Sequence, residues 1–145
     1  MSDPLYRREL LRLAADAAGA GRLDNPDGSA TAYNPACGDR VTVDIRRKDG
    51  RVAALAHETR ACVLAQASAA ILGAHATGLD QAKLKALADC VAAMLSGGPA
   101  PAAPFQDFAV FDGAASHKGR HKCVLLPLEA AMTALAASNP AKPGA

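Results

Sequence analysis

The chain has 145 residues, of which 50% are hydrophobic but only 3% aromatic, and its formal net charge at pH 7 is +2. This length suits one domain whose core is built from alanine and leucine in closely packed helices. The near-neutral charge and the lack of a Lys/Arg stripe argue against a nucleic-acid partner, and no apolar run is long enough to cross a membrane. We expect one domain over residues 1–138, a disordered tail over residues 139–145 and, without a signal peptide, a cytoplasmic protein.

The first half of the chain predicts one helix followed by strands. The helix begins at Pro4, which Asp3 caps, and ends near Gly19. Apolar and polar residues then alternate with the period of a half-buried strand, and Lys48-Asp49-Gly50 has the composition of a hairpin turn. The predicted strands lie at residues 29–33, 41–45 and 51–59.

The second half predicts three helices. The first covers residues 63–76, and the second is capped by Asp80 and buries apolar residues at helical spacing. Residues 97–119 are expected to form a breaker-rich connector and an irregular segment. Cys123 is expected to open the last helix, with Pro127 tolerated in its first turn. The predicted fold class is therefore α+β, a small antiparallel sheet of about three strands with helices packed on it.

The four cysteines differ in their predicted positions. In a reducing compartment they indicate metal ligands, reactive thiols or core residues rather than disulfides. Cys37 lies in a glycine-containing loop, and Cys62 and Cys123 stand at expected helix starts, where the helix dipole favours a thiolate. Cys90 lies within a helix beside its apolar face, so we interpret it as structural.

The loop Asn34-Pro35-Ala36-Cys37-Gly38-Asp39 places a thiol and a carboxylate around a glycine that can adopt a positive φ. Alone, this pattern is more typical of a simple turn than of a functional site. Structural zinc sites commonly use Cys-x-x-Cys pairs, whereas here single ligands would come from distant segments. Three thiolates suit zinc or an iron–sulfur cluster, and the harder carboxylate is a more exchangeable ligand, which favours a site that opens.

Basic residues precede Cys123. His121 is either an alternative metal ligand or a solvated loop histidine, because imidazole binds zinc and iron readily. Arg120 and Lys122 either belong to an ordinary solvated run or offset the negative charge of the thiolates and carboxylate.

Three motifs, in their order along the chain, resemble the U-type iron–sulfur assembly proteins of the IscU/SufU/NifU N-terminal family. They are Asn34 to Asp39, Ala61-Cys62 followed by Ala67-Ser68-Ala69, and Arg120-His121-Lys122-Cys123. The resemblance extends from about Leu5 to about Leu135. Lys122, and an extra segment at residues 97–119, are most similar to the SufU branch. One departure is Thr59-Arg60-Ala61, where the family has a glycine-rich approach to its second cysteine. This replacement is expected to place a cation, Arg60, near the thiolates.

This resemblance implies a SufE/NifU-like fold and one zinc ion held by Cys37, Asp39, Cys62 and Cys123. It also implies that Cys37 accepts persulfide sulfur from a cysteine desulfurase of the SufS type, with Arg120 as a basic residue beside the site. Downstream iron–sulfur carriers or scaffold proteins would be further partners, and any enzymatic activity would be that of a sulfurtransferase.

Two alternatives remain open from the sequence. In one, the same four residues bind iron and a nascent [2Fe–2S] cluster for transfer to apo-proteins. In the other, the zinc is purely structural, which the exchangeable Asp39 ligand and the scattered thiols argue against.

Overall fold

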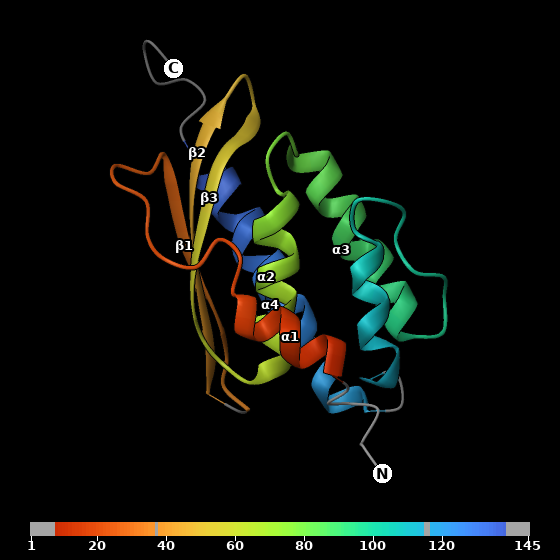
Figure 1. The fold of residues 1–145 in the computed structure, drawn as a ribbon. Coiled ribbons are helices and arrows are strands. Elements are labelled where there is room, and N and C mark those ends of the chain that lie inside the picture. Colours follow the sequence, from red (N-terminus) through yellow and green to blue (C-terminus); the bar gives the residue numbers. More distant parts are fainter. Residues whose placement is uncertain (1–7, 37, 115–116, 139–145) are drawn as a thin grey trace.

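The computed structural model describes residues 8–36, 38–114 and 117–138 and combines a small sheet with packed helices (Figure 1). The strands are β1 (Gly28–Asn34), β2 (Asp39–Lys48) and β3 (Arg51–Arg60). The helices are α1 (Arg8–Asp16), α2 (Val63–His75), α3 (Gln81–Leu95) and α4 (Lys118–Ala137), with a 3₁₀ helix, η2 (Gln106–Ala114). The predicted α+β fold with three antiparallel strands is confirmed.

The sheet has the order β1-β2-β3 and is antiparallel throughout. The turn between β2 and β3 has positive φ at both Asp49 and Gly50, as the predicted hairpin requires. Asn34 pairs with Asp39 where β1 meets β2, and Arg40 pairs with Arg60 at the end of β3. The connections that leave β1 and β3 therefore lie at the same end of the sheet.

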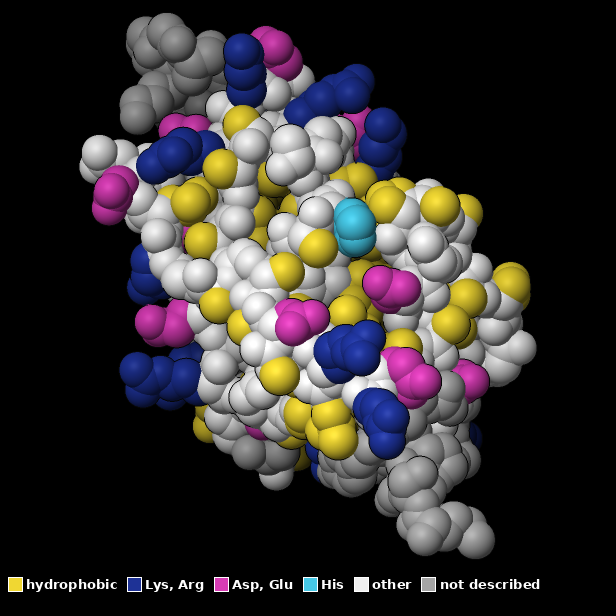
Figure 2. All heavy atoms as spheres, in the orientation of Figure 1, with side chains coloured by type: hydrophobic (Ala, Val, Ile, Leu, Met, Phe, Trp, Pro, Cys, Tyr) yellow, Lys and Arg dark blue, Asp and Glu magenta, His cyan; other side chains and the backbone are white. Residues whose placement is uncertain are grey.

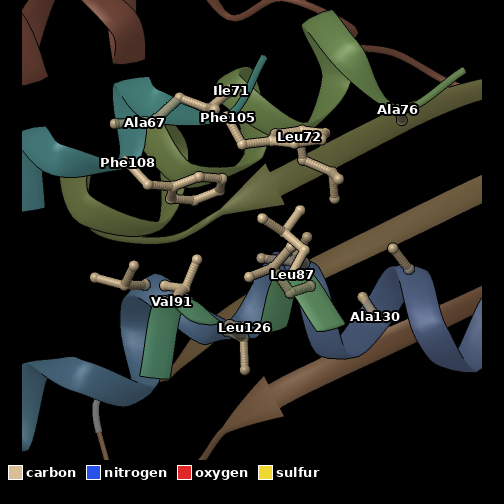
Figure 3. Packing of buried hydrophobic residues seen from close by; sticks show 14 of the residues in the cluster. Ala67, Ile71, Leu72, Ala76, Leu87, Val91, Phe105, Phe108, Leu126 and Ala130 are labelled. Atoms are coloured by element: carbon tan, nitrogen blue, oxygen red, sulfur yellow. The ribbon is translucent and has the colours of Figure 1, made fainter. Parts of the chain in front are cut away.

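The helices cover one face of the sheet, which we call the inner face (Figure 1). Val41, Val43 and Ile45 of β2 are completely buried on this face, because successive strand side chains point to opposite sides. Figure 3 shows the packing behind them, where Ile71 and Leu72 of α2 lie among other labelled core residues from α3, η2 and α4. The apolar faces of the predicted helices thus pack together in one continuous core.

Two glycines allow the close contacts that an alanine-rich core requires. A Cβ on Gly28 would stand 2.0 Å from the carbonyl oxygen of Ala134 in α4. A Cβ on Gly73 would stand 2.3 Å from the carbonyl oxygen of Ala18. Real side chains never approach so closely, so these positions let α4 lie on β1 and the end of α1 lie on α2.

The segment after α1 extends the sheet edge and then passes onto the outer face. The amide of His57 in β3 donates to the carbonyl of Gly19, and the amide of Gly21 donates to the carbonyl of His57, at 2.9 and 2.8 Å. Arg22 then binds Asp44, whose side chain points to the outer face of β2. This crossing buries Asp44 although none of the described helices covers that side of the sheet (Figure 1).

The last helix differs from its prediction. It begins at Lys118, so Cys123 lies in its second turn rather than at its start, and Pro127 lies inside the helix rather than in its first turn. The polar run Lys118 to Lys122 has no apolar periodicity, which hid the helix start in the sequence. Proline has no N–H, so the carbonyl of Cys123 lacks the amide donor that an ordinary residue 127 would supply.

The other boundaries follow the predictions closely. Asp80 accepts a hydrogen bond from the amide of Lys83 at 2.8 Å and so caps α3 as expected. The segment expected to be irregular contains η2, which buries Phe108 and Phe111. The predicted cap at Asp3, the helix start at Pro4 and the tail at residues 139–145 lie outside the described residues. Within the described part of the chain, no helix is both long and apolar enough to cross a membrane.

Candidate metal centre

Three of the four predicted ligands lie together in the structure. Asp39 begins β2, Cys62 caps α2 and Cys123 lies in α4, so three elements distant in sequence each contribute one side chain. One potential ligand atom from each of the three residues lies within 4.8 Å of the other two. Such spacing suits side chains that share one metal ion.

Asp39 is the least satisfied member of this group. Its side chain is only 6% exposed. Oδ1 accepts a hydrogen bond from the amide of Cys62 at 3.1 Å, whereas Oδ2 is buried and has no hydrogen-bond partner among the described residues. A buried carboxylate oxygen without a donor is costly unless a cation binds it. The carboxylate therefore fits a metal ligand.

Cys62 stands where the sequence predicted, at the N-cap of α2, and makes no side-chain capping bond there. Its thiol therefore takes no part in a capping hydrogen bond to the helix backbone. Gln66 stabilises this turn, since its backbone amide donates to the carbonyl of Cys62 and its Nε2 donates to the carbonyl of Ala61, both at 3.0 Å. The first turn of α2 thus holds the half-buried thiol near Asp39.

Cys123 has a different environment from the predicted one. It is 1% exposed and lies away from the helix start, so the helix dipole does not explain thiolate formation there. Burial raises the pKa of its thiol well above the usual range, and the neighbouring Cys62 and Asp39 raise this pKa further. A divalent cation among the three groups would reverse this effect, because a coordinating thiol is deprotonated by the metal. The donor set fits zinc or iron.

A buried hydrogen bond fixes the two cysteine-bearing helices relative to each other. Ser68 of α2 is completely buried, and its hydroxyl donates to the carbonyl of Val124 in α4 at 2.6 Å. Val124 follows Cys123 directly, and Pro127 lies one turn further on. Ser68 therefore links α2, which begins directly after Cys62, to the part of α4 that carries Cys123.

Cys37, the fourth predicted ligand, lies outside the described residues, but its loop is partly described. Asn34 is 4% exposed, and its Oδ1 accepts a hydrogen bond from the amide of Ala36 at 3.2 Å. Its carbonyl accepts one from the amide of Gly38 at 2.8 Å, and Gly38 adopts the expected positive φ of 76°. Sequence reasoning missed this role of Asn34, although asparagine commonly organises such turns through its side chain.

The predicted supporting residues occupy the start of α4. Arg120 and His121 are half-buried and Lys122 is exposed. The Nε2 atom of His121 donates to the carbonyl of Ala114 at 3.1 Å, so one of its two ring nitrogens is engaged by the segment before α4. Arg60, by contrast, pairs with Arg40 on the outer face, on the opposite side of the sheet from the Asp39 side chain.

The remaining cysteine and the buried histidine do not join the cluster. Cys90 is half-buried in α3, away from the three grouped ligands, as its structural interpretation requires. His57 is 4% exposed on β3, and both of its ring nitrogens are engaged, Nδ1 with Thr59 Oγ1 at 2.9 Å and Nε2 with the carbonyl of Ala18 at 2.8 Å. Burial lowers the pKa of His57, so it is a neutral structural residue at pH 7.

Comparisons with known proteins agree with this arrangement. The family model of the NifU-like N-terminal domain matches residues 5–124. Two curated proteins of Archaeoglobus fulgidus, the iron–sulfur cluster assembly scaffold proteins IscU 1 and IscU 2, are each 36% identical over 81 residues, or 54% of this chain and 52% of the relative. The chain therefore spans about half the length of the curated relatives it matches.

Solved structures share the whole fold. A nitrogen-fixing NifU-like protein (N-terminal) from Brucella abortus is 34% identical with a TM-score of 0.88, over 93% of this chain and 94% of that one. A putative iron–sulfur cluster assembly scaffold protein for the SUF system from Fervidobacterium islandicum has a TM-score of 0.82 at 20% identity, over 93% and 99% of the two chains, which supports the fold alone. The chain belongs to the NifU-like N-terminal domain family of iron–sulfur cluster assembly proteins.

Proposed function

We propose that the chain is a zinc-dependent acceptor of persulfide sulfur from a cysteine desulfurase in iron–sulfur cluster assembly. The observation that carries this proposal is the convergence of Asp39, Cys62 and Cys123, with one buried carboxylate oxygen that lacks a hydrogen-bond partner among the described residues. Cys37, two residues before Asp39, is the proposed fourth ligand.

The donor set is compatible with the proposed zinc ion. Sulfur and carboxylate oxygen are both accepted zinc ligands, and a tetrahedral site needs four of them. When bound, zinc would keep the thiols deprotonated at neutral pH and slow their oxidation. Asp39, Cys62 and Cys123 are each held by a separate element, so these three side chains keep their places if the fourth ligand moves.

Cys37 is the proposed acceptor. Its thiolate attacks the outer sulfur of the donor's cysteine persulfide, the donor's S–S bond breaks, and the donor cysteine leaves as a thiolate while Cys37 becomes the persulfide. The neighbouring Gly38, with its positive φ, supports this role because a glycine hinge lets the loop move. Arg120 and Lys122 would supply positive charge near the thiolates, and His121, two residues before Cys123, would be an alternative ligand.

The partners and the location follow from the same proposal. Lys122 before Cys123 and the extra segment at residues 97–119 support the SufU branch, and with it a SufS-type desulfurase as donor. Downstream iron–sulfur carriers or scaffold proteins would receive the sulfur, in the cytoplasm. The activity would be that of a sulfurtransferase.

The competing function is that of a scaffold. Here iron and a nascent [2Fe–2S] cluster are cargo, held by the same residues and passed to apo-proteins, and the scaffold names of the Archaeoglobus relatives favour it. In this function Asp39 is the exchangeable ligand, so Asp39→Ala should slow the release of a reconstituted cluster. Faster decay of the cluster in the variant would contradict that role.

Metal content tests the site itself. Protein purified without added metal should carry about one zinc ion per chain, and Cys62→Ser should lose most of it. Cys90→Ser is the matched control and should retain zinc, because Cys90 lies outside the cluster. Elemental analysis measures the zinc in each protein. A zinc content near zero in the wild type as well as in Cys62→Ser would show that the chain has no such zinc site.

Sulfur transfer separates the two functions. The zinc-loaded chain should raise the turnover of its own organism's cysteine desulfurase, and Cys37→Ser should abolish this rise. After a single turnover, mass spectrometry should find the added sulfur on Cys37. If the zinc form gives neither result while the iron-loaded form assembles and transfers a cluster, the scaffold function is correct.

A further inference from the structure

The outer face of the sheet carries a row of three large side chains beside the metal centre. Tyr33 of β1 pairs with Arg40 of β2, which pairs with Arg60 of β3, so the three lie side by side across the strands. The Arg40 guanidinium carbon lies 5.8 Å from the centre of the Tyr33 ring. We call these three residues the outer row. In Figure 2, charged side chains project along the edge of the molecule where the sheet lies.

The charge of the outer row is not balanced within the described chain. Two like charges directly opposite each other on neighbouring strands are destabilising. Neither Arg40 nor Arg60 forms an ion pair with a described residue, although Glu58 lies in the next row. The two adjacent exposed arginines form a positively charged surface, and an acidic partner would neutralise this charge.

A shallow groove runs beside this row. It has a volume of about 400 Å³ and is lined by polar residues only, namely Thr31, Arg40, Thr42, Glu58 and Arg60. All of these side chains are exposed except Thr42, which is half-buried, and the two threonine hydroxyls are bonded to each other at 2.8 Å. The open, polar and largely exposed lining suits contact with a charged segment of another protein.

The composition of the row is that of an interface. Tyr33 is 51% exposed, and among the described residues only Tyr33 and Leu11 are large hydrophobic side chains with such exposure. Tyrosine and arginine are enriched at the centres of protein–protein interfaces because they combine large contact area with hydrogen-bonding groups.

The position of the row links it to the metal centre. Arg40 follows Asp39 directly, and Arg60 precedes Cys62 by two residues. The ligands lie at one end of the sheet and the outer row lies at the same end, on the opposite face. A protein that reaches the ligands from this end would also cover the row.

We propose that the outer row, Tyr33, Arg40 and Arg60, docks an acidic surface segment of the protein that donates sulfur to the metal centre. This inference rests on the proposed function, because the occupant is the desulfurase of that function. The row contributes affinity and orientation for the donor and takes no part in the chemistry.

The chain contains a matched control for a charge-reversal test. Lys48 and Arg51 are also exposed cations that pair directly across β2 and β3, but at the hairpin end, away from the ligands. Arg40→Glu/Arg60→Glu and Lys48→Glu/Arg51→Glu therefore make the same change of charge in the same two strands. Only the first pair lies beside the metal centre.

Calorimetric titration of the zinc-loaded chain with its own organism's cysteine desulfurase gives the readout. Arg40→Glu/Arg60→Glu should raise Kd about tenfold or more at low salt, and the wild-type Kd should rise with salt. Lys48→Glu/Arg51→Glu should change Kd by less than about threefold, and Tyr33→Ala should weaken binding with little change in salt dependence. Zinc content must remain at the wild-type value in every variant.

Three results would overturn the inference. The first is an unchanged Kd in Arg40→Glu/Arg60→Glu, and the second is no binding of the desulfurase by the wild type. The third is a loss of self-association in that variant without a loss of desulfurase binding, since the occupant would then be a second copy of the chain. The proposed function fails separately, when the wild type binds the desulfurase but takes no sulfur from it.

Discussion

Two buried carboxylates on strand β2 have opposite surroundings. Asp44, on the outer face, is 1% exposed and accepts hydrogen bonds from Arg22 Nε at 2.7 Å, Ser29 Oγ at 2.7 Å and the amide of Leu23 at 3.1 Å. Asp39, on the inner face, is 6% exposed, and the described residues give it one such bond, from the amide of Cys62. Both positions are equally polar in the sequence, but the described residues donate hydrogen bonds to both carboxylate oxygens of Asp44 and to only one of Asp39.

The difference distinguishes a structural carboxylate from a ligand. The hydrogen bond from Arg22 lowers the pKa of Asp44 in spite of the opposing effect of burial, so Asp44 stays charged and fastens the crossing segment to the sheet. Asp39 lies next to the thiols of Cys62 and Cys123, whereas Asp44 lies next to several hydrogen-bond donors. A buried carboxylate oxygen with no donor among the described residues, next to two thiols, has the chemistry of a metal ligand.

The largest effect is expected from Asp44→Ala. Its removal leaves the donors of Arg22, Ser29 and Leu23 without their acceptor, and the free energy of unfolding should fall by about 2–4 kcal/mol. Zinc content should not change, because Asp44 is on the other face. Urea denaturation and elemental analysis measure the two quantities. A loss of zinc at unchanged stability would reverse the assignment of the two carboxylates.

Ser68→Ala should act on stability and on the metal centre together. The carbonyl of Val124 loses a buried donor, so the free energy of unfolding should fall by about 1–2 kcal/mol. Because Ser68 holds α2 against α4, zinc affinity, measured by competition with a chelator, should fall as well. Ser96→Ala, at the exposed C-cap of α3, is the control and should change neither. Unchanged zinc affinity in Ser68→Ala would show that this bond does not position the cysteines.

His57 provides a pH test on a third buried polar residue. Its folded pKa lies below the ordinary value of 6.5, so unfolding takes up a proton at lower pH. The stability contributed by neutral His57 is present above pH 6.5 and should be lost as pH falls below it, by at most about 1.4 kcal/mol per pH unit.

Denaturation at pH 7 and pH 5.5 should show this slope in the wild type and a smaller one in His57→Gln. His75→Gln, at the exposed end of α2, should behave as the wild type does. The contribution of Asp44 has a separate window, since its lowered pKa places the loss below about pH 3.8. Equal slopes in the wild type and His57→Gln would assign the pH dependence to other groups.

The smallest effect is expected from Asp39→Asn in metal-free protein. The fold gains little from this carboxylate, so the free energy of unfolding should change by less than about 1 kcal/mol in the presence of a chelator. Added zinc should stabilise the wild type more than the variant, because ligand binding to the folded state adds to stability. A metal-free loss as large as that of Asp44→Ala would make Asp39 a structural residue too.

Local patterns were sufficient for most of the secondary structure. The alternation at Val41, Val43 and Ile45 predicted β2, and the capping chemistry of Asp80 predicted the start of α3. The position of Cys62 before α2 was predicted correctly for the same reason. Each of these features depends on residues within one turn or one strand, and such short-range preferences can be recognised in a single sequence.

Local patterns failed where a contact from elsewhere decides the outcome. The first turn of α4 is polar, so its helical form has no apolar periodicity, and the hydrogen bond from Ser68 to Val124 that joins α4 to α2 is invisible in the sequence. The pairing of Arg60 with Arg40 likewise placed a cation on the outer face, where the sequence suggested one beside the thiolates.

The sequence alone determined the identity of the candidate ligands and the α+β framework that carries them. Only the tertiary structure decided that Asp39, Cys62 and Cys123 meet and that Cys123 is buried. It also decided that the described residues donate to both oxygens of Asp44 but to only one of Asp39. The physical reason is that burial and hydrogen-bond satisfaction are properties of packed, non-neighbouring elements. They arise when α4 and the α2 start are packed against one sheet, and no short stretch of chain contains them.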